Sequence, residues 1–172
     1  MKLSILVPAY NEEASIEAIL KRLAAVDFGV EHEVVVIDDG SKDATAGKVA
    51  ALNDPRVRLL RHPENRGKGA AIRTGLTSAR GDWVIVQDAD LEYDPADIPR
   101  LLRPALAGEA EVVFGSRILN RGNSFSYQRY YWGGRLVSLW TTLLYGQTIT
   151  DEPTCYKLLR TEFLRSLRLE CE

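Results

Sequence analysis

The sequence predicts an α/β fold in which a doubly wound, mostly parallel sheet carries helices on both faces. Short apolar segments rich in β-branched residues alternate with segments whose apolar residues have helical spacing. Polar residues follow nearly every apolar segment. The chain has 172 residues, of which 45% are hydrophobic and 27% are charged, as is typical of one globular domain. We therefore expect residues 1–172 to form a single domain.

Five apolar segments have the character of strands that are buried on both faces of a parallel sheet. Each is short and continuous rather than alternating with polar residues. They span residues 3–8, 33–38, 57–61, 83–87 and 111–115. Two helices are predicted by apolar residues close to positions i, i+3, i+4 and i+7. Their apolar residues are Ile16, Ile19, Leu20 and Leu23 in the first helix and Ile98, Leu101, Leu102 and Leu106 in the second.

A polar cluster follows each predicted strand. The clusters are PAYNE (8–12), DDGS (38–41), HPENRGKG (62–69), DADLE (88–92) and GSR (115–117). The carboxyl ends of parallel strands lie at one edge of an open α/β sheet, and ligands bind outside that edge. Some clusters also have an ordinary structural explanation, since Gly40 and Ser41 suit a turn and a helix cap. Taken together, the clusters predict a ligand site at this edge.

The DADLE cluster places three carboxylates, those of Asp88, Asp90 and Glu92, directly after a buried segment. Their mutual repulsion requires compensation, which a divalent cation would supply. Magnesium takes oxygen ligands, typically one or two carboxylates together with water and substrate phosphates. The three side chains would share one face if the chain stayed extended, and a turn after the strand is an equal alternative. The cluster therefore predicts a metal-bound diphosphate.

Other classes of protein fit the sequence less well. No GxGxxG motif follows the first predicted strand, and ENRGKGA lacks the spacing of a P-loop, which disfavours nicotinamide enzymes and ATPases. Phosphatases of the HAD type carry their DxD pair after the first strand, whereas here the pair follows the fourth. A net charge of −2 excludes a generally basic nucleic-acid binder. Two cysteines, Cys155 and Cys171, are too few for a disulfide framework.

Six motifs occur in order along nearly the whole chain. They are VPAYNEE, VIDDGSKD, NRGKGAAIRTG, QDADLEYDP, GSR and DEPTCYKLLR. Together they closely resemble the family 2 glycosyltransferases with a GT-A fold, in particular the dolichyl-phosphate and polyprenyl-phosphate sugar synthases. The resemblance implies an inverting transfer of a hexose from a nucleotide diphosphate sugar, of the GDP-mannose or UDP-glucose type, to a polyprenyl phosphate. Members of this subgroup usually continue for some dozens of residues, so we expect this catalytic domain to be truncated at its C-terminus.

The resemblance also implies a role for individual residues. It places Mg²⁺ or Mn²⁺ at the DxD segment and Arg117 near the phosphates of the donor. The residues implied around the nucleoside are Pro8, Tyr10, Glu12, Ile37 and Asp39, and those around diphosphate and metal are Asp88, Ala89, Asp90 and Glu92. Family members often have glutamine at the position of Glu92, which leaves open whether Glu92 binds the metal directly.

Charge is segregated in the segment from Val112 to Thr150, which contains four arginines and no Asp, Glu or Lys. A phosphate acceptor is already largely ionised at neutral pH, so it needs cations to hold it and no general base. We expect the arginines to bind such an acceptor, with Arg117, Arg129 and Arg135 as catalytic candidates beside Asp90. A hydroxyl acceptor would instead need a base, and Asp151 and Glu152 are the acids near this region. A sugar-nucleotide binder without catalytic activity is a further alternative.

Residues 117–150 are expected to form an acceptor-side segment that faces a membrane. The apolar stretch from Leu136 is too short to span a bilayer, and the Tyr, Trp and Arg residues around it are typical of a helix at the membrane interface. A core helix or a contact in a homo-oligomer would have a similar composition. The N-terminus lacks the pattern of a secretory signal. We therefore expect a cytoplasmic protein that binds peripherally to the cytoplasmic face of the membrane.

Overall fold

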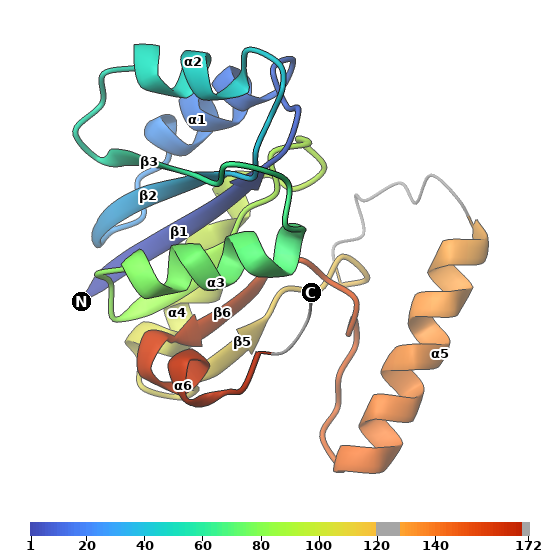
Figure 1. The fold of residues 1–172 in the computed structure, drawn as a ribbon. Helices are drawn as coiled ribbons and strands as arrows, with labels where there is room; N and C mark the ends of the chain where they lie inside the picture. The colour runs from blue at the N-terminus through green and yellow to red at the C-terminus, as the bar shows by residue number, and fades with distance from the viewer. Residues whose placement is uncertain (120–127, 170–172) are drawn as a thin grey trace.

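The computed structural model describes residues 1–119 and 128–169, and these form a sheet with helices on both faces (Figure 1). The strands are β1 (Lys2–Ala9), β2 (Glu31–Asp38), β3 (Val57–Arg61), β4 (Trp83–Val86), β5 (Val112–Phe114) and β6 (Lys157–Arg160). The helices are α1 (Ile16–Ala25), α2 (Thr45–Ala51), α3 (Lys68–Ser78), α4 (Ile98–Leu106), α5 (Gln128–Tyr145) and α6 (Thr161–Ser166), with a 3₁₀ turn η1 (Pro95–Asp97). The predicted α/β fold class is confirmed.

The strand order in the described part of the chain is β3-β2-β1-β4-β6-β5. Strand β1 pairs in parallel with β2 and β4, and β2 pairs in parallel with β3. The sequence did not predict β6, which lies antiparallel between β4 and β5. This strand has four residues, of which the first, Lys157, and the last, Arg160, are charged. It therefore lacks the continuous apolar character that predicted the other strands.

The core lies on both faces of the sheet, as the continuous apolar strands predicted. Leu3, Ile5 and Val7 of β1 pack on one face with α1 and α4. Leu6 of β1 packs on the other face with α3 and α6. The four apolar residues predicted for α1 are all buried, whereas in α4 the predicted Leu106 is 51% exposed. Ala105 is buried in α4 instead, because it stands at position i+7 from Ile98, whereas Leu106 stands one position further around the helix.

The loops at the carboxyl edge of the sheet are packed backbone against backbone. Gly40, after β2, has a φ of +72°, and a Cβ placed there would lie 2.4 Å from the carbonyl carbon of Glu64. Only glycine therefore allows the turn after β2 to approach the loop after β3. Ser41 does not cap α2, because its Oγ accepts a hydrogen bond from the backbone N–H of Asn11 at 2.9 Å. This contact joins the turns after β1 and β2.

Helix α5 stands beside the sheet rather than on it (Figure 1). Its Ser138 is buried and accepts a hydrogen bond from the backbone N–H of Glu152 at 2.9 Å, so the returning chain packs along one side of the helix. Large apolar side chains on the remaining surface are exposed: Trp132, Leu136, Val137, Leu139, Trp140, Leu143, Leu144 and Tyr145. Within the described residues, no helix combines the length and the hydropathy needed to cross a bilayer.

Candidate active site

A pocket of about 300 Å³ opens at the carboxyl edge of the sheet, where the loops after β1, β2, β3 and β4 meet. It is lined by Pro8, Ala9, Tyr10, Glu12, Asp39, Asn65, Lys68, Ala71, Asp88, Ala89 and Asp90. Seven of the residues predicted for donor binding are therefore brought together. Of the others, Ile37 is fully buried in the core, while Glu92 and Arg117 do not line this pocket.

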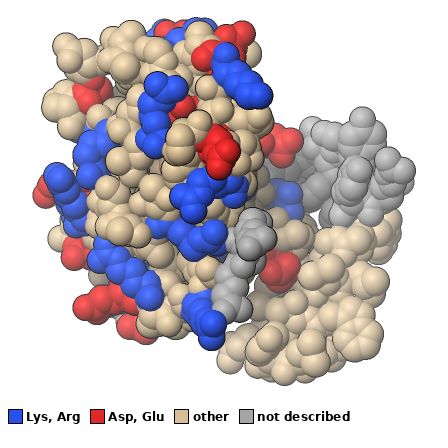
Figure 2. All heavy atoms as spheres, in the orientation of Figure 1, with Lys and Arg blue, Asp and Glu red and all other residues tan. Residues whose placement is uncertain are grey.

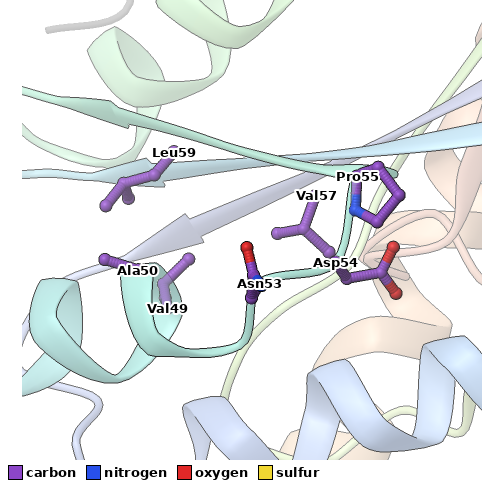
Figure 3. A pocket seen from close by; sticks show the side chains of 7 residues that line it. All are labelled: Val49, Ala50, Asn53, Asp54, Pro55, Val57 and Leu59. Carbon is purple, nitrogen blue, oxygen red and sulfur yellow. The ribbon is translucent and has the colours of Figure 1, made fainter.

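A second hollow, of about 370 Å³, lies between α2 and β3 and contains none of the predicted residues (Figure 3). It is lined mainly by small and apolar side chains, including Val49, Val57 and Leu59. Its carboxylate, that of Asp54, is held by Arg56 of the same loop at 2.7 Å. This hollow offers little polar chemistry, so the first pocket is the candidate active site.

Asp39 is buried in the pocket wall and holds the loop that follows β3. Its Oδ1 accepts hydrogen bonds from His62 Nδ1 at 2.6 Å and from the backbone N–H of Arg66 at 3.0 Å. Its Oδ2 accepts one from the backbone N–H of Gly67 at 2.8 Å. Because a carboxylate can only accept, Nδ1 of His62 is the donor in the first of these bonds. Asp39 therefore orders the pocket in addition to any contact that it makes with a nucleoside.

His62 and Lys68 are site residues that the sequence reasoning missed. Both lie in the HPENRGKG cluster, which was placed at the correct edge without a role for either side chain. His62 is buried, and its Nε2 lies 2.9 Å from Thr74 Oγ1 on α3. Lys68 Nζ lies 2.5 Å from Asp88 Oδ1. Partial burial lowers the pKa of Lys68, but the bond to Asp88 and the negative charges of Asp88 and Asp90 together raise it, so the side chain stays cationic.

The DADLE cluster forms a turn, so the extended alternative is wrong. Leu91 has a φ of +65°, and Asp90 Oδ1 accepts a hydrogen bond from the backbone N–H of Glu92 at 3.0 Å. The described residues contain no group of three His, Cys, Asp or Glu side chains that could hold a metal together. Of the three acids in the cluster, Asp88 and Asp90 line the pocket, while Glu92 is exposed outside its lining.

Two carboxylates fit the requirements of a divalent cation that also binds a diphosphate. Magnesium and similar hard ions often take one or two carboxylates and complete their shell with phosphate oxygens and water. Asp88 and Asp90 would supply the protein ligands, and Lys68 adds a positive charge beside them. Direct ligation by Glu92 stays a prediction.

Arg117 and Asp151 form a partly buried ion pair that contradicts one premise of the sequence reasoning. Arg117 Nε and Nη2 donate to Asp151 Oδ2 and Oδ1 at 2.8 and 2.9 Å, and the backbone N–H of Arg117 also donates to Oδ2 at 2.9 Å. The segment itself contains no acid, but an acid that lies 34 residues away pairs with this arginine. The expectation that the arginines of this segment have no acid to pair with is therefore wrong for Arg117.

The pair also disfavours Asp151 as a general base. Burial raises the pKa of Asp151, but the hydrogen bonds and the positive charge of Arg117, with a smaller effect of Lys157, together lower the pKa below its ordinary value. The same bonds raise the pKa of Arg117. A carboxylate with a lowered pKa and both oxygens in hydrogen bonds is a poor proton acceptor. Arg135 is exposed on α5, whereas Arg121, the side chain of Arg129 and Cys171 lie outside the described residues.

The Glycosyl transferase family 2 model matches residues 4–168. The chain belongs to this family. It is 33% identical, over 131 residues, to a dolichol-phosphate mannosyltransferase of Pyrococcus furiosus, covering 76% of this chain and 37% of that protein. It is 40% identical, over 141 residues, to an undecaprenyl-phosphate 4-deoxy-4-formamido-L-arabinose transferase of Pseudomonas aeruginosa, covering 79% of this chain and 40% of that protein. The chain thus spans less than half the length of these two relatives.

The structure of this family member is also similar to that of glucosyl-3-phosphoglycerate synthase from Mycobacterium tuberculosis. The TM-score is 0.70 at 26% identity, over 96% of this chain and 60% of that chain. A second crystal structure of that synthase, in complex with Mn²⁺, UDP-glucose and phosphoglyceric acid, gives a TM-score of 0.71 at 27% identity, covering 96% of this chain and 59% of that chain. These neighbours confirm the predicted GT-A fold.

Replacing Asp151 by asparagine should lower the free energy of unfolding by about 2 kcal/mol near neutral pH, because asparagine cannot form the charged fork with Arg117. The pKa of Asp151 is lowered on folding, so its stabilisation is present above the unfolded value of about 3.9 and is lost as pH falls through the folded pKa. The difference between wild type and Asp151→Asn should therefore shrink below about pH 4. Urea unfolding across this pH range measures it.

Glu111→Gln is a suitable control for this experiment. Glu111 lies 3.7 Å from Arg160, and both side chains are more than half exposed. Its replacement should change stability by less than about 0.5 kcal/mol. If the difference between wild type and Asp151→Asn stayed constant down to about pH 3, the ion pair would not be the source of the stability.

Proposed function

We propose that this chain transfers a hexose, with inversion, from a nucleotide diphosphate sugar to a polyprenyl phosphate. The pocket that joins Asp88, Asp90 and Lys68 to Tyr10 and Asp39 carries the donor part of the proposal. The names of the curated relatives, which include dolichol-phosphate and undecaprenyl-phosphate transferases, support the acceptor part. The donor is of the GDP-mannose or UDP-glucose type.

Asp88 and Asp90 would hold Mg²⁺ or Mn²⁺ against the donor diphosphate. Negative charge grows on the departing diphosphate as its bond to the sugar breaks, and a divalent cation stabilises that charge. Crystal structures of the structural neighbour with Mn²⁺ and UDP-glucose support this assignment. Lys68 Nζ, which lies 2.5 Å from Asp88, would add a second positive charge beside the leaving group. Pro8, Tyr10 and Glu12 would face the nucleoside.

The proposed acceptor is a phosphate, whose ionisation at neutral pH decides what the site must provide. A phosphate monoester is largely ionised at neutral pH and can attack the sugar carbon without a general base. Arg129 and Arg135 of α5 would hold that phosphate, because guanidinium groups match phosphate oxygens. Arg117 would lie beside the phosphates in the orientation that Asp151 fixes.

Transfer to a hydroxyl is the second candidate. The structural neighbour crystallised with UDP-glucose together with phosphoglyceric acid, a small molecule that carries a hydroxyl group, supports it. The reaction would need a general base, and Asp151 is disfavoured by its lowered pKa. Glu152 is half-buried and lies 3.9 Å from Lys157. A binder without catalytic activity is the remaining alternative, which a turnover assay would decide.

We also propose that residues 117–150 form an acceptor-side segment at the cytoplasmic face of the membrane. Leu136, Leu139, Trp140 and Leu143 follow helical spacing on one side of α5, and each is more than half exposed. The side of α5 that faces the viewer is largely uncharged (Figure 2). Such a surface suits insertion into the boundary between headgroups and acyl chains. A homo-oligomer that buries the same side chains is the competing arrangement.

The first prediction from the proposed function is that nucleotide affinity depends on metal through Asp90. Asp90→Asn should remove most of the affinity gain that Mn²⁺ gives to GDP or UDP, because the gain requires a carboxylate beside the diphosphate. Calorimetric titration with Mg²⁺, with Mn²⁺ and with chelator measures it. Asp27→Asn, at the opposite edge of the sheet, should behave as wild type. If wild type bound the nucleotide with equal affinity under all three conditions, the metal assignment would be wrong.

The second prediction concerns the acceptor phosphate. Arg129→Ala or Arg135→Ala should lower kcat/KM for a polyprenyl phosphate roughly ten- to a hundredfold while donor affinity stays nearly unchanged, because each loses a charge-assisted contact of about 1.5–3 kcal/mol. A steady-state assay with the lipid in vesicles gives kcat/KM. Glu152→Gln tests the alternative hydroxyl acceptor, because only a hydroxyl acceptor needs a general base. Silent arginine variants together with an inactive Glu152→Gln would favour the hydroxyl acceptor.

The third prediction concerns membrane contact. Leu143→Glu should weaken binding to anionic phospholipid vesicles about tenfold or more, because it exchanges an apolar side chain that is 67% exposed for a charge. Leu106→Glu is the control, since Leu106 is 51% exposed on α4 and should leave vesicle binding unchanged. Co-sedimentation measures binding, and light scattering gives the oligomeric state. A shift from dimer to monomer in Leu143→Glu, with unchanged vesicle binding, would assign α5 to a subunit contact.

A further inference from the structure

Gln87 is a fully buried polar residue directly after β4 and directly before the DADLE turn. Its side-chain Nε2 donates to the carbonyl oxygens of Asp88 at 3.0 Å and of Tyr93 at 3.4 Å. Its Oε1 accepts a hydrogen bond from the hydroxyl of Tyr156 at 2.5 Å. An amide buried without partners would be destabilising, so these bonds are needed where the side chain lies. One side chain thus joins the beginning and the end of the turn.

Tyr93 attaches the far end of the turn to the chain around β6. Its hydroxyl accepts a hydrogen bond from the backbone N–H of Cys155 at 3.0 Å. Its ring lies 4.8 Å from that of Tyr156, measured between centroids. Burial raises the pKa of Tyr156, so its hydroxyl keeps the proton that it donates to Gln87. The turn is therefore anchored by groups that are distant in the sequence.

The turn needs such anchors because its own geometry is unfavourable. Leu91 has a φ of +65°, a region that residues other than glycine rarely adopt. Within the described residues, the carboxylate of Asp90 accepts a hydrogen bond only from Glu92, which belongs to the same turn. The position of Asp90 in the pocket thus depends on the backbone of the turn and on whatever fixes that backbone.

We propose that Gln87 and Tyr156 are positioning residues that fix the turn from Asp88 to Tyr93, so that Asp88 and Asp90 face a donor diphosphate and its metal together. This inference rests on the proposed donor site. Gln87 acts through the carbonyl groups at both ends of the turn, and Tyr156 acts by orienting the amide of Gln87. Neither side chain lines the pocket, so neither would touch the substrate.

Tyr156→Phe tests the inference, because it removes the donated hydrogen bond and keeps the ring. Thr161→Val is the matched control: Thr161 is also buried, and its hydroxyl donates to the carbonyl of Gly81 at 2.6 Å, before β4 begins. Both variants should lose stability in urea unfolding by similar amounts. Only Tyr156→Phe should reduce the Mn²⁺-dependent gain in GDP or UDP affinity, by about three- to tenfold. Affinity in chelator should be unchanged in both.

Gln87→Met gives a second variant, which should reduce the metal-dependent gain at least as much as Tyr156→Phe; if it does not fold, Tyr156→Phe still decides the question. A normal metal-dependent gain in Tyr156→Phe, with a loss of stability like that of Thr161→Val, would overturn the positioning role and leave the proposed function intact. Absence of any metal-dependent gain in wild type would overturn both. The two failures are thus distinguishable.

Discussion

The carboxylate of Asp39 holds together the loops from which the pocket is made. It lies at the end of β2 and accepts three hydrogen bonds from the chain that follows β3. These bonds fix the backbone around Gly67, where α3 begins, and Lys68 at the start of α3 then reaches Asp88 after β4. Gly40 allows the close approach that the bonds require. The relative placement of three strand ends therefore depends on one buried acid.

The sheet and its binding edge could be predicted because they depend on local patterns. Five strands were predicted from apolar segments, and the parallel topology then placed every polar cluster on one edge. The pairs Lys68–Asp88 and Arg117–Asp151 could not be predicted, because each joins residues that the fold alone brings together. Strand β6 was missed for the same reason, since its pairing with β4 and β5 compensates for a short, charged sequence.

The segregation of charge along the chain did not show which acids and bases form ion pairs. The acid-free segment is real, yet its first arginine lies in a fork with an acid just beyond the segment. An ion pair with a partly buried carboxylate fixes the geometry of both partners and makes the acid a poor proton acceptor. Arg117 therefore fixes the position of Asp151 whether or not it also contacts phosphate.

The turn that carries Asp90 and the chain that leads from Asp151 to β6 share a set of contacts around Tyr93. Its backbone carbonyl accepts from Gln87 and its hydroxyl from Cys155, while the guanidinium of Arg117 lies 5.9 Å from the centre of its ring. Arg117 is in turn bound to Asp151, from which the chain runs on to Cys155 and β6. A displacement of the segment from Asp151 to Tyr156 would therefore reach the turn that carries Asp90. Because α5 packs on Glu152 through Ser138, an event at the exposed surface of α5 has a contiguous physical connection to the turn that carries Asp88 and Asp90.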